Sequence, residues 1–171
     1  MIDKIISLRE MYKQHGSGTP YFSLKGVQTY ARVIDVYDGD TITVVFDTNG
    51  FFLKFKCRLA GVDTCEIRSK NKENKQLAVL ARSRLFNLIT GNVMNEEIRK
   101  KELIQYFDDH VFIIWLHCLE FDKYGRLLIQ CYSSAEAQKS FSEILIEEKL
   151  AYPYDGETKL AEKQQVQFLT T

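Results

Sequence analysis

Runs of apolar, β-branched and aromatic residues dominate the middle of the chain, between Val27 and Tyr132. Such runs, bounded by glycine and small polar residues, are typical of β-strands. We predict five strands: ARVIDVY at 31–37, TITVVF at 41–46, FFLKFKCRLAGV at 51–62, VFIIWLHCLEF at 111–121 and RLLIQCY at 126–132. Asp38-Gly39 and Asn49-Gly50 predict tight hairpins between the first three strands. Lys123-Tyr124-Gly125 separates the last two strands closely enough for antiparallel pairing.

Apolar positions at helical spacing predict two helices after the third and fifth strands. Residues 75–90 place apolar side chains on one face, namely Leu77, Leu80, Ala81, Leu85 and Leu88. Gly91 is well placed to end this helix. Ser140 and Glu143 have the spacing of a capping box, which predicts a second helix that ends near Leu150.

The order of these elements predicts a single barrel domain with extensions. Residues 1–26 form an N-terminal extension, in which a short amphipathic helix over 3–15 is followed by the flexible joint GSGTP. The domain occupies 27–157 and contains a charged insertion at 92–110, and 158–171 is a helical tail. We therefore predict an α+β, mainly β fold: a five-stranded OB-type β-barrel with about three helices packed on it.

The amino-acid composition argues against some classes of function and some cellular locations. The 23 Lys and Arg residues balance 23 Asp and Glu residues, which argues against coating nucleic acid by charge alone but allows a local basic cleft. The four cysteines are scattered without a C-x-x-C pair, which favours free thiols in a reducing compartment. No apolar run is long enough to span a membrane, and the first residues lack the apolar centre of a secretion signal. We expect an intracellular, cytoplasmic protein with no membrane partner.

Three segments carry residues suited to chemistry: YDGDT at 37–41, CRLAGVDTCEIR at 57–68 and FDKYGR at 121–126. Each has an ordinary interpretation in isolation, as a hairpin turn, a strand end with solvated charges, or a polar turn. The carboxylates that begin one strand and end its neighbour can nevertheless approach each other, and oxygen ligands of this kind suit a hard cation such as Ca²⁺.

The three segments, in this order, resemble the staphylococcal nuclease, or thermonuclease, family. The resemblance extends from about Arg32 to Tyr154 and is carried by D-G-D-T at 38–41, R-L-x-x-V-D-T-x-E at 58–66 and D-K-Y-G-R at 122–126. It implies an OB-type barrel and a metal-dependent nuclease that uses Ca²⁺ to hydrolyse phosphodiester bonds of DNA and RNA with low sequence specificity. One departure from the family pattern is Cys65, where the family often has proline.

The resemblance also implies roles for individual residues. Asp40 and Asp63, with the carbonyl of Thr64, would be the metal ligands, Glu66 would be the general base, and Arg58 and Arg126 would hold the phosphate. The positions around the bound nucleotide correspond to Lys123, Tyr124, Tyr152 and Tyr154. Packing of a helix onto the barrel explains the last two tyrosines equally well, and Lys123 also fits a solvated turn.

Elementary chemistry agrees with these roles. Hydrolysis of a phosphodiester requires an activated water, and guanidinium groups match phosphate oxygens in paired hydrogen bonds. The three carboxylates and two arginines sum to a charge of −1, which one divalent cation changes to +1, so metal and substrate should bind cooperatively. Arg58 and Asp63 are five residues apart, an offset that points side chains to opposite faces of a regular strand. A bulge or bend at Gly61 could bring them together.

Three functions are compatible with the sequence. The first is a nuclease that acts on DNA and RNA, preferably on single or transiently unpaired strands, with weak sequence preference because stacking on a tyrosine ring tolerates any base. The second is a catalytically weak or inactive OB-type module that binds nucleic acid, since a fold alone does not prove activity. The third is an interaction domain that docks a protein partner through residues 1–20 or 92–110. The oligomeric state is not specified by the sequence.

Overall fold

The computed structural model describes residues 2–95 and 98–171. In chain order its elements are α1 Ile2–Tyr12, β1 Gln28–Val36, β2 Thr41–Thr48, β3 Phe51–Leu59, β4 Val62–Asp63, α2 Lys72–Thr90, α3 Lys100–Asp109, β5 Phe112–Phe121, β6 Leu127–Tyr132, α4 Phe141–Glu147, β7 Tyr152–Pro153 and α5 Glu162–Thr170. All five predicted strands are present. Two short strands, β4 and β7, pair with each other outside the main sheet and were not predicted.

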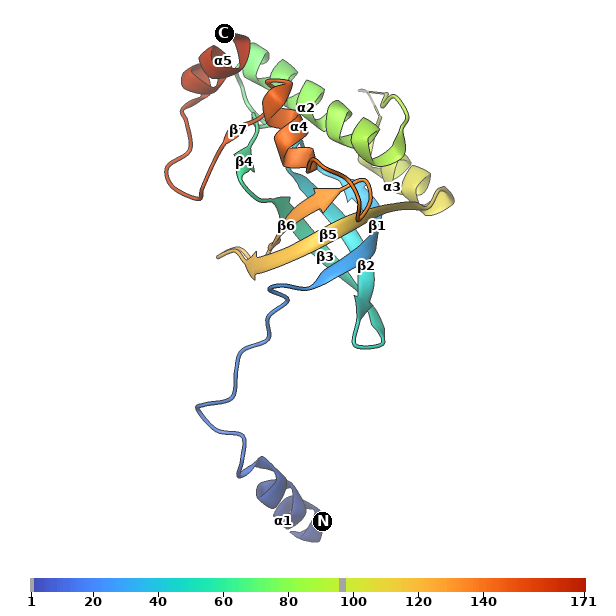
Figure 1. The fold of residues 1–171 in the computed structure, drawn as a ribbon, viewed down its shortest axis with the longest axis vertical. Coiled ribbons are helices and arrows are strands. Elements are labelled where there is room, and N and C mark those ends of the chain that lie inside the picture. Colours follow the sequence, from blue (N-terminus) through green and yellow to red (C-terminus); the bar gives the residue numbers. More distant parts are fainter. Residues whose placement is uncertain (1, 96–97) are drawn as a thin grey trace.

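The five long strands close into a barrel in the order β1-β2-β3-β6-β5 (Figure 1). The pairs β1–β2, β2–β3, β5–β6 and β1–β5 are antiparallel, and the parallel pair β3–β6 completes the closure. The helices α2, α4 and α5 gather above one end of the barrel in Figure 1. This arrangement confirms the predicted OB-type α+β fold.

The two predicted hairpins close in different ways. Asn49 and Gly50 have φ angles of 54° and 86°, as the Asn-Gly pair predicts for a primed turn. In the β1–β2 connection, by contrast, neither Asp38 nor Gly39 has a positive φ. A Cβ atom on Gly39 would lie 2.6 Å from the Cβ of Ala81 and 2.9 Å from the Cγ2 of Thr64. Glycine is therefore required at position 39 for close approach to α2 and to Thr64, rather than for the turn itself.

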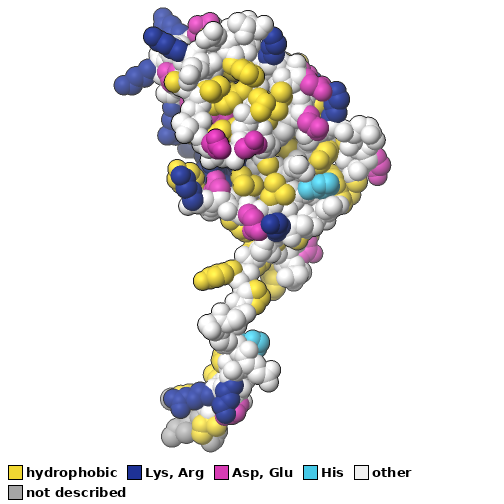
Figure 2. Space-filling model, turned by 60° about the vertical axis from the view of Figure 1, so that its left-hand side comes forward, with side chains coloured by type: hydrophobic (Ala, Val, Ile, Leu, Met, Phe, Trp, Pro, Cys, Tyr) yellow, Lys and Arg dark blue, Asp and Glu magenta, His cyan; other side chains and the backbone are white. Residues whose placement is uncertain are grey.

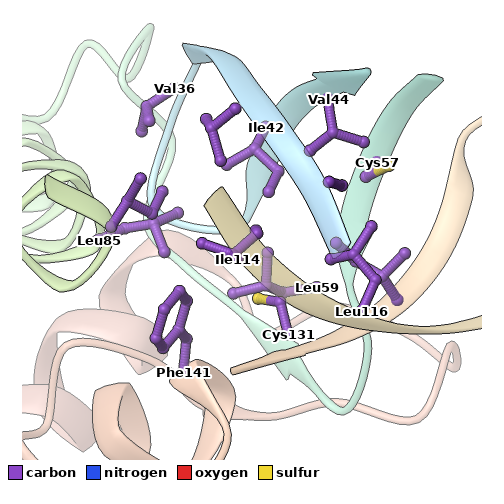
Figure 3. Packing of buried hydrophobic residues seen from close by; sticks show 14 of the residues in the cluster. Val36, Ile42, Val44, Cys57, Leu59, Leu85, Ile114, Leu116, Cys131 and Phe141 are labelled. Atoms are coloured by element: carbon purple, nitrogen blue, oxygen red, sulfur yellow. The ribbon is translucent and has the colours of Figure 1, made fainter. Parts of the chain in front are cut away.

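The barrel interior is a continuous apolar core. Figure 3 shows side chains from several strands, among them Ile42, Leu59 and Ile114, pointing toward one another. Leu85 of α2 and Phe141 of α4 face this group and close one end of the barrel. The capping box of Ser140 and Glu143 and the left-handed Gly91 after α2 are both formed, as the sequence predicts.

Helix α2 faces the core differently from the prediction. Leu80, which was assigned to the buried face, is 48% exposed. Ala81 and Leu85 are buried as predicted, and Ala78, which was not assigned to this face, is buried with them. The small side chains of the two alanines let the helix approach the β1–β2 connection closely, as the position of Ala81 beside Gly39 shows.

The predicted insertion at 92–110 contributes to the core. Residues 96–97 of this segment lie outside the described residues. From Lys100 onward the chain forms α3, whose Leu103 and Phe107 are fully buried. The ring of Phe107 lies 5.8 Å from the rings of both Phe86 and Phe112. This part of the predicted insertion therefore supplies a helix that packs on the core.

The N-terminal extension projects away from the barrel, as Figures 1 and 2 show. Its helix ends at Tyr12, and the side chains of residues 4–12 are exposed. At the other end of the chain, Gln165 and Leu169 of α5 are buried. The two ends thus differ, because α5 packs on the domain whereas α1 does not.

The packing of α3 predicts a large loss of stability in Phe107→Ala. Deleting a buried phenylalanine ring should lower the free energy of unfolding by roughly 3 to 5 kcal/mol, through lost burial and the cavity left behind. Urea denaturation would measure the change. Ile104→Ala on the exposed side of the same helix is the control and should have a small effect. Equal effects of the two substitutions would show that α3 is not part of the cooperative core.

Candidate functional site

Arg58 lies at the centre of the candidate site. Its side chain is buried, and the guanidinium contacts the carboxylates of both Asp40 and Asp63. The Nη2 atom donates to Asp63 Oδ1 at 2.6 Å and to the Val62 carbonyl oxygen at 3.0 Å, and Nη1 donates to Asp40 Oδ2. The two aspartates, far apart in the sequence, thus converge on one planar cation.

Strand register and a bend explain this convergence. Thr41 pairs with Arg58 across β2 and β3, which places Asp40 beside Arg58. The Asp40 carbonyl oxygen accepts from the Leu59 amide at 2.8 Å, so the connection is held to β3. Gly61 has a φ of 78°, a conformation that favours glycine, and it turns the chain so that Asp63 reaches back to Arg58. The expected bend at Gly61 is confirmed.

Burial and mutual repulsion govern the charges of this group. Burial, together with the carboxylates of Asp38 and Asp63, raises the pKa of Asp40 to about 7, although Arg58 and the Thr41 hydroxyl oppose the shift. Burial lowers the pKa of Arg58, but the two ion pairs outweigh it and the pKa is raised above its usual value. The aspartates therefore gain from any additional positive charge nearby, and Arg58 remains cationic.

A buried chain of hydrogen bonds supports Asp63 from behind. The Tyr152 hydroxyl donates to Asp63 Oδ2 and accepts from Gln165 Nε2 at 3.1 Å. Gln165 Oε1 in turn accepts from Asn74 Nδ2 at 2.7 Å, and Asn74 Oδ1 accepts from the Glu66 amide at 3.3 Å. The chain begins at Asp63 and ends at Glu66, so α2, α5 and β7 together hold two of the predicted functional residues.

Glu66 lies at the surface of the site and has a partner that the sequence did not predict. Lys159 Nζ lies 3.0 Å from Glu66 Oε1 and 2.9 Å from Asp63 Oδ1. Burial lowers the pKa of Lys159, but these two carboxylates outweigh it and the pKa is raised. The ammonium group of Lys159 therefore lies between Asp63, a predicted metal ligand, and Glu66, the predicted general base.

Arg126 is oriented by the turn that precedes it. Asp122 Oδ2 accepts from Arg126 Nε at 2.7 Å, while Asp122 Oδ1 accepts from the backbone amides of Tyr124 and Arg126 at 2.8 and 2.9 Å. Burial raises the pKa of Asp122, but these hydrogen bonds outweigh it and the pKa is lowered. The ring of the exposed Tyr124 lies against this turn, 5.6 Å from the Arg126 guanidinium and 5.2 Å from Lys123 Nζ.

Two cavities meet at these residues. A small one, of about 150 Å³, is lined by Asp40, Thr64, Glu66 and both arginines. A cleft of about 660 Å³ is lined by Lys123, Tyr124 and Tyr154, and it shares Arg58, Arg126 and Lys159 with the small cavity. The larger cleft thus opens beside the charged group. Figure 2 shows Lys and Arg side chains gathered along one edge of the body, so a neutral total charge coexists with local asymmetry.

The predicted tyrosines divide into two kinds. Tyr154 lies 5.6 Å from the Arg58 guanidinium and lines the larger cleft, as does Tyr124. Tyr152 is only 2% exposed and lines neither cavity. Its ring is therefore covered in this structure and offers no face to a base, in contrast to the predicted nucleotide contact. Its hydroxyl supports Asp63 instead.

The oxygen atoms of the site are of the kind that could coordinate a divalent metal ion. Asp40 and Thr64, in the wall of the small cavity, and the buried carboxylate of Asp63 behind it supply oxygen atoms of the kind that hard cations such as Ca²⁺ prefer. Within residues 2–95 and 98–171, no group of three or more His, Cys, Asp or Glu side chains is arranged to hold a metal ion. The residues fit in the kind of donor, and backbone oxygens or water would have to complete the coordination.

The hydrogen-bond chain predicts that Tyr152→Phe is destabilising. Loss of the hydroxyl leaves a buried oxygen of Asp63 and a buried donor of Gln165 without a partner, which should cost about 1 to 3 kcal/mol of unfolding free energy. Urea denaturation in metal-free buffer would measure the change. Tyr154→Phe is the matched control, because its hydroxyl donates to the Glu157 carbonyl at an exposed position where water can substitute. Similar losses in the two variants would contradict a supporting role for Tyr152.

Comparison with known proteins adds an independent finding. A search of curated proteins finds no match to this chain. The family model described as staphylococcal nuclease homologue matches residues 56–171, more than half of the chain. The matched range contains Arg58, Asp63, Glu66 and Arg126 but not Asp40, which precedes it. No helix in the described residues is both long and apolar enough to cross a membrane. On the family match, the chain belongs to the staphylococcal nuclease homologue family.

Proposed function

We propose that the protein is a calcium-dependent nuclease that hydrolyses phosphodiester bonds of single-stranded DNA or RNA with low sequence specificity. One observation carries the proposal: Asp40 and Asp63 converge on the Arg58 guanidinium in the wall of a cavity that Glu66 and Arg126 also line. This cavity combines anionic oxygens for a cation with guanidinium donors for a phosphate. Membership of the staphylococcal nuclease homologue family supports the same class of activity.

The residues would divide the chemistry among them. Glu66 is exposed and can accept a proton from an attacking water, as a general base must. Arg58 and Arg126 supply charged donors to the phosphoryl oxygens, where negative charge grows during the reaction. Ca²⁺, held by Asp40, Asp63 and the Thr64 carbonyl, would supply further positive charge to the water and the phosphate. Asp122 fixes the direction of Arg126 before substrate arrives.

Low sequence specificity is supported by the larger cleft. Tyr124 is 73% exposed and lies beside two cations, Lys123 and Arg126. An aromatic ring stacks on any base, and the neighbouring cations can reach the phosphate backbone. A base can reach such a ring only when it is unpaired. We therefore propose single strands as the preferred substrate.

Lys159 and Asp122 both enter the charge count on which the metal requirement rests. With Lys159 and with Asp122, the ion-pair partner of Arg126, both included, four carboxylates face three cations, and the group has a formal charge of −1 without a metal ion. A divalent cation at Asp63 would have to compete with the Lys159 ammonium for the same carboxylate oxygen. Metal affinity should thus be lower than the aspartates alone would provide.

The proposed activity predicts calcium-dependent digestion of single-stranded DNA. Cleavage should appear on titration with Ca²⁺ and stop on addition of a chelator. Glu66→Gln should reduce the rate by roughly 10²- to 10⁴-fold, the contribution typical of a general base. Cleavage of a fluorescently labelled oligonucleotide would measure the rate.

Glu73→Gln, which removes an exposed carboxylate from the first turn of α2, is the control and should leave the rate unchanged. Binding of the oligonucleotide without cleavage, with any of several divalent ions, would favour the catalytically inactive binding module instead.

Competition by Lys159 predicts that Lys159→Gln binds Ca²⁺ more tightly. Loss of two ion pairs of moderate strength should improve affinity by about threefold to tenfold. Isothermal titration calorimetry of the protein with Ca²⁺, without substrate, measures this directly. Lys163→Gln, an exposed lysine of α5, is the control for the change in net charge. If the two variants bind Ca²⁺ equally well, Lys159 does not compete for the metal site.

A further inference from the structure

A third cavity lies beside the candidate site and has no role in the chemistry described above. Its volume is about 170 Å³. Three cationic side chains line it, Arg68, Arg82 and Lys100, together with one carboxylate, Asp35, and the ring of Tyr37. These groups sum to a formal charge of +2. The described side chains that line the cavity therefore carry an excess of positive charge, although the net charge of the whole chain is zero.

The cations of this cavity lack the partners that other site cations have. Arg58 and Arg126 are each paired with carboxylates in the neighbouring site. Arg82 donates through Nε to the Val36 carbonyl oxygen at 3.0 Å, and no ion pair engages its terminal nitrogens within residues 2–95 and 98–171. In the same ranges, the side chains of Arg68 and Lys100 make no hydrogen bond or ion pair. Each of the three cationic side chains thus has hydrogen-bond donors available for an anion.

Asp35 shows that these cations are close enough to act together. Burial raises the pKa of Asp35, while Lys100 and Arg82 lower it through their charges. Neither cation forms a direct ion pair with Asp35, so their donors remain open. The charge of Asp38 also acts on Arg82, so two carboxylates stand against three cations among the described residues. One positive charge is left over, and an anion with several oxygen acceptors would balance it.

The cavity continues the candidate site along two stretches of chain. Tyr37 lines both this cavity and the small cavity that contains Asp40 and Glu66. Arg68 follows Glu66 by two residues, so their Cα atoms can be no more than about 7.6 Å apart. The larger cleft with Tyr124 shares residues with the small cavity but none with this one. The small cavity therefore lies between the other two.

We propose that Arg68, Arg82 and Lys100 form a second phosphate subsite, which binds a backbone phosphate that flanks the scissile phosphate on the side away from Tyr124. This subsite rests on the proposed function, since it assumes a nucleic-acid strand in the neighbouring cavity. It lets the enzyme hold a longer strand more tightly than a dinucleotide. Contacts with phosphate carry no sequence information, in agreement with low specificity.

The test uses the double variant Arg68→Gln/Lys100→Gln. Neither side chain has a partner in the described part of the chain, so their neutralisation should not disturb folding, whereas Arg82 also holds the β1 carbonyl of Val36. All proteins carry Glu66→Gln to prevent cleavage and are measured with Ca²⁺ present. Fluorescence anisotropy gives their affinity for single-stranded oligodeoxynucleotides, from a dinucleotide to a dodecamer, over a range of salt concentrations.

We expect unchanged affinity of the double variant for the dinucleotide and a roughly tenfold loss for the dodecamer. The slope of log affinity against log salt concentration should fall by about 0.7 for each lost phosphate contact on a single strand. Asp35→Asn should have the opposite effect, because it removes the carboxylate that lines the cavity among the described residues, and should tighten binding of the dodecamer alone. The control Arg9→Gln/Lys163→Gln makes the same change in charge at residues that line none of the three cavities.

Two results would overturn the subsite while leaving the proposed function intact. One is an equal loss of affinity at every oligonucleotide length, and the other is an equal loss in the control pair, since both would reflect the general electrostatic field. Failure of the parent protein to bind any oligonucleotide is a different outcome. It would remove the proposed function, and the subsite with it.

Discussion

The buried guanidinium of Arg58 is the interaction on which the candidate site depends. Two carboxylates with almost no exposure to solvent would repel each other, and Arg58 lies between them with a donor directed at each. Burial of a single unpaired charge costs several kcal/mol, so the three groups are stable only as a set. This constraint fixes the relative positions of β2, β3 and β4.

The segments around this ion pair show how the constraint is met. Gly39 allows the β1–β2 connection to press against α2, and the bend at Gly61 returns Asp63 to Arg58. Behind Asp63, the chain of Tyr152, Gln165 and Asn74 joins the C-terminal helix to α2. Residues 158–171 therefore do more than form a tail. Gln165 donates to the Tyr152 hydroxyl that in turn donates to Asp63, and Lys159 adds an ion pair to the same aspartate.

Sequence reasoning succeeded where structure is determined locally. The strand runs, the Asn49-Gly50 turn and the capping box of α4 each depend on residues within a few positions of one another, and the motif positions of Arg58, Asp63 and Glu66 did converge. The sequence patterns did not predict features that depend on contacts between residues far apart in the chain. The irregular loop before α5 gives no periodic signal that could place Lys159 beside Asp63, and the exposed Leu80 shows that helical spacing alone does not choose the buried face.

Arg58 and Lys159 both contact Asp63, and their different exposure to solvent indicates which of them a metal ion there could replace. The Arg58 side chain is 8% exposed and donates to two carboxylates and a backbone oxygen, so its removal would leave several buried acceptors without donors. The Lys159 side chain is 44% exposed, comes from an irregular loop and can be hydrated as soon as it leaves. Lys159 is therefore the cation that would give way if Asp40 and Asp63 held a metal ion, and Arg58 would keep its contacts. Lys159 also lines both cavities, so its ammonium could contact a phosphate bound in either one.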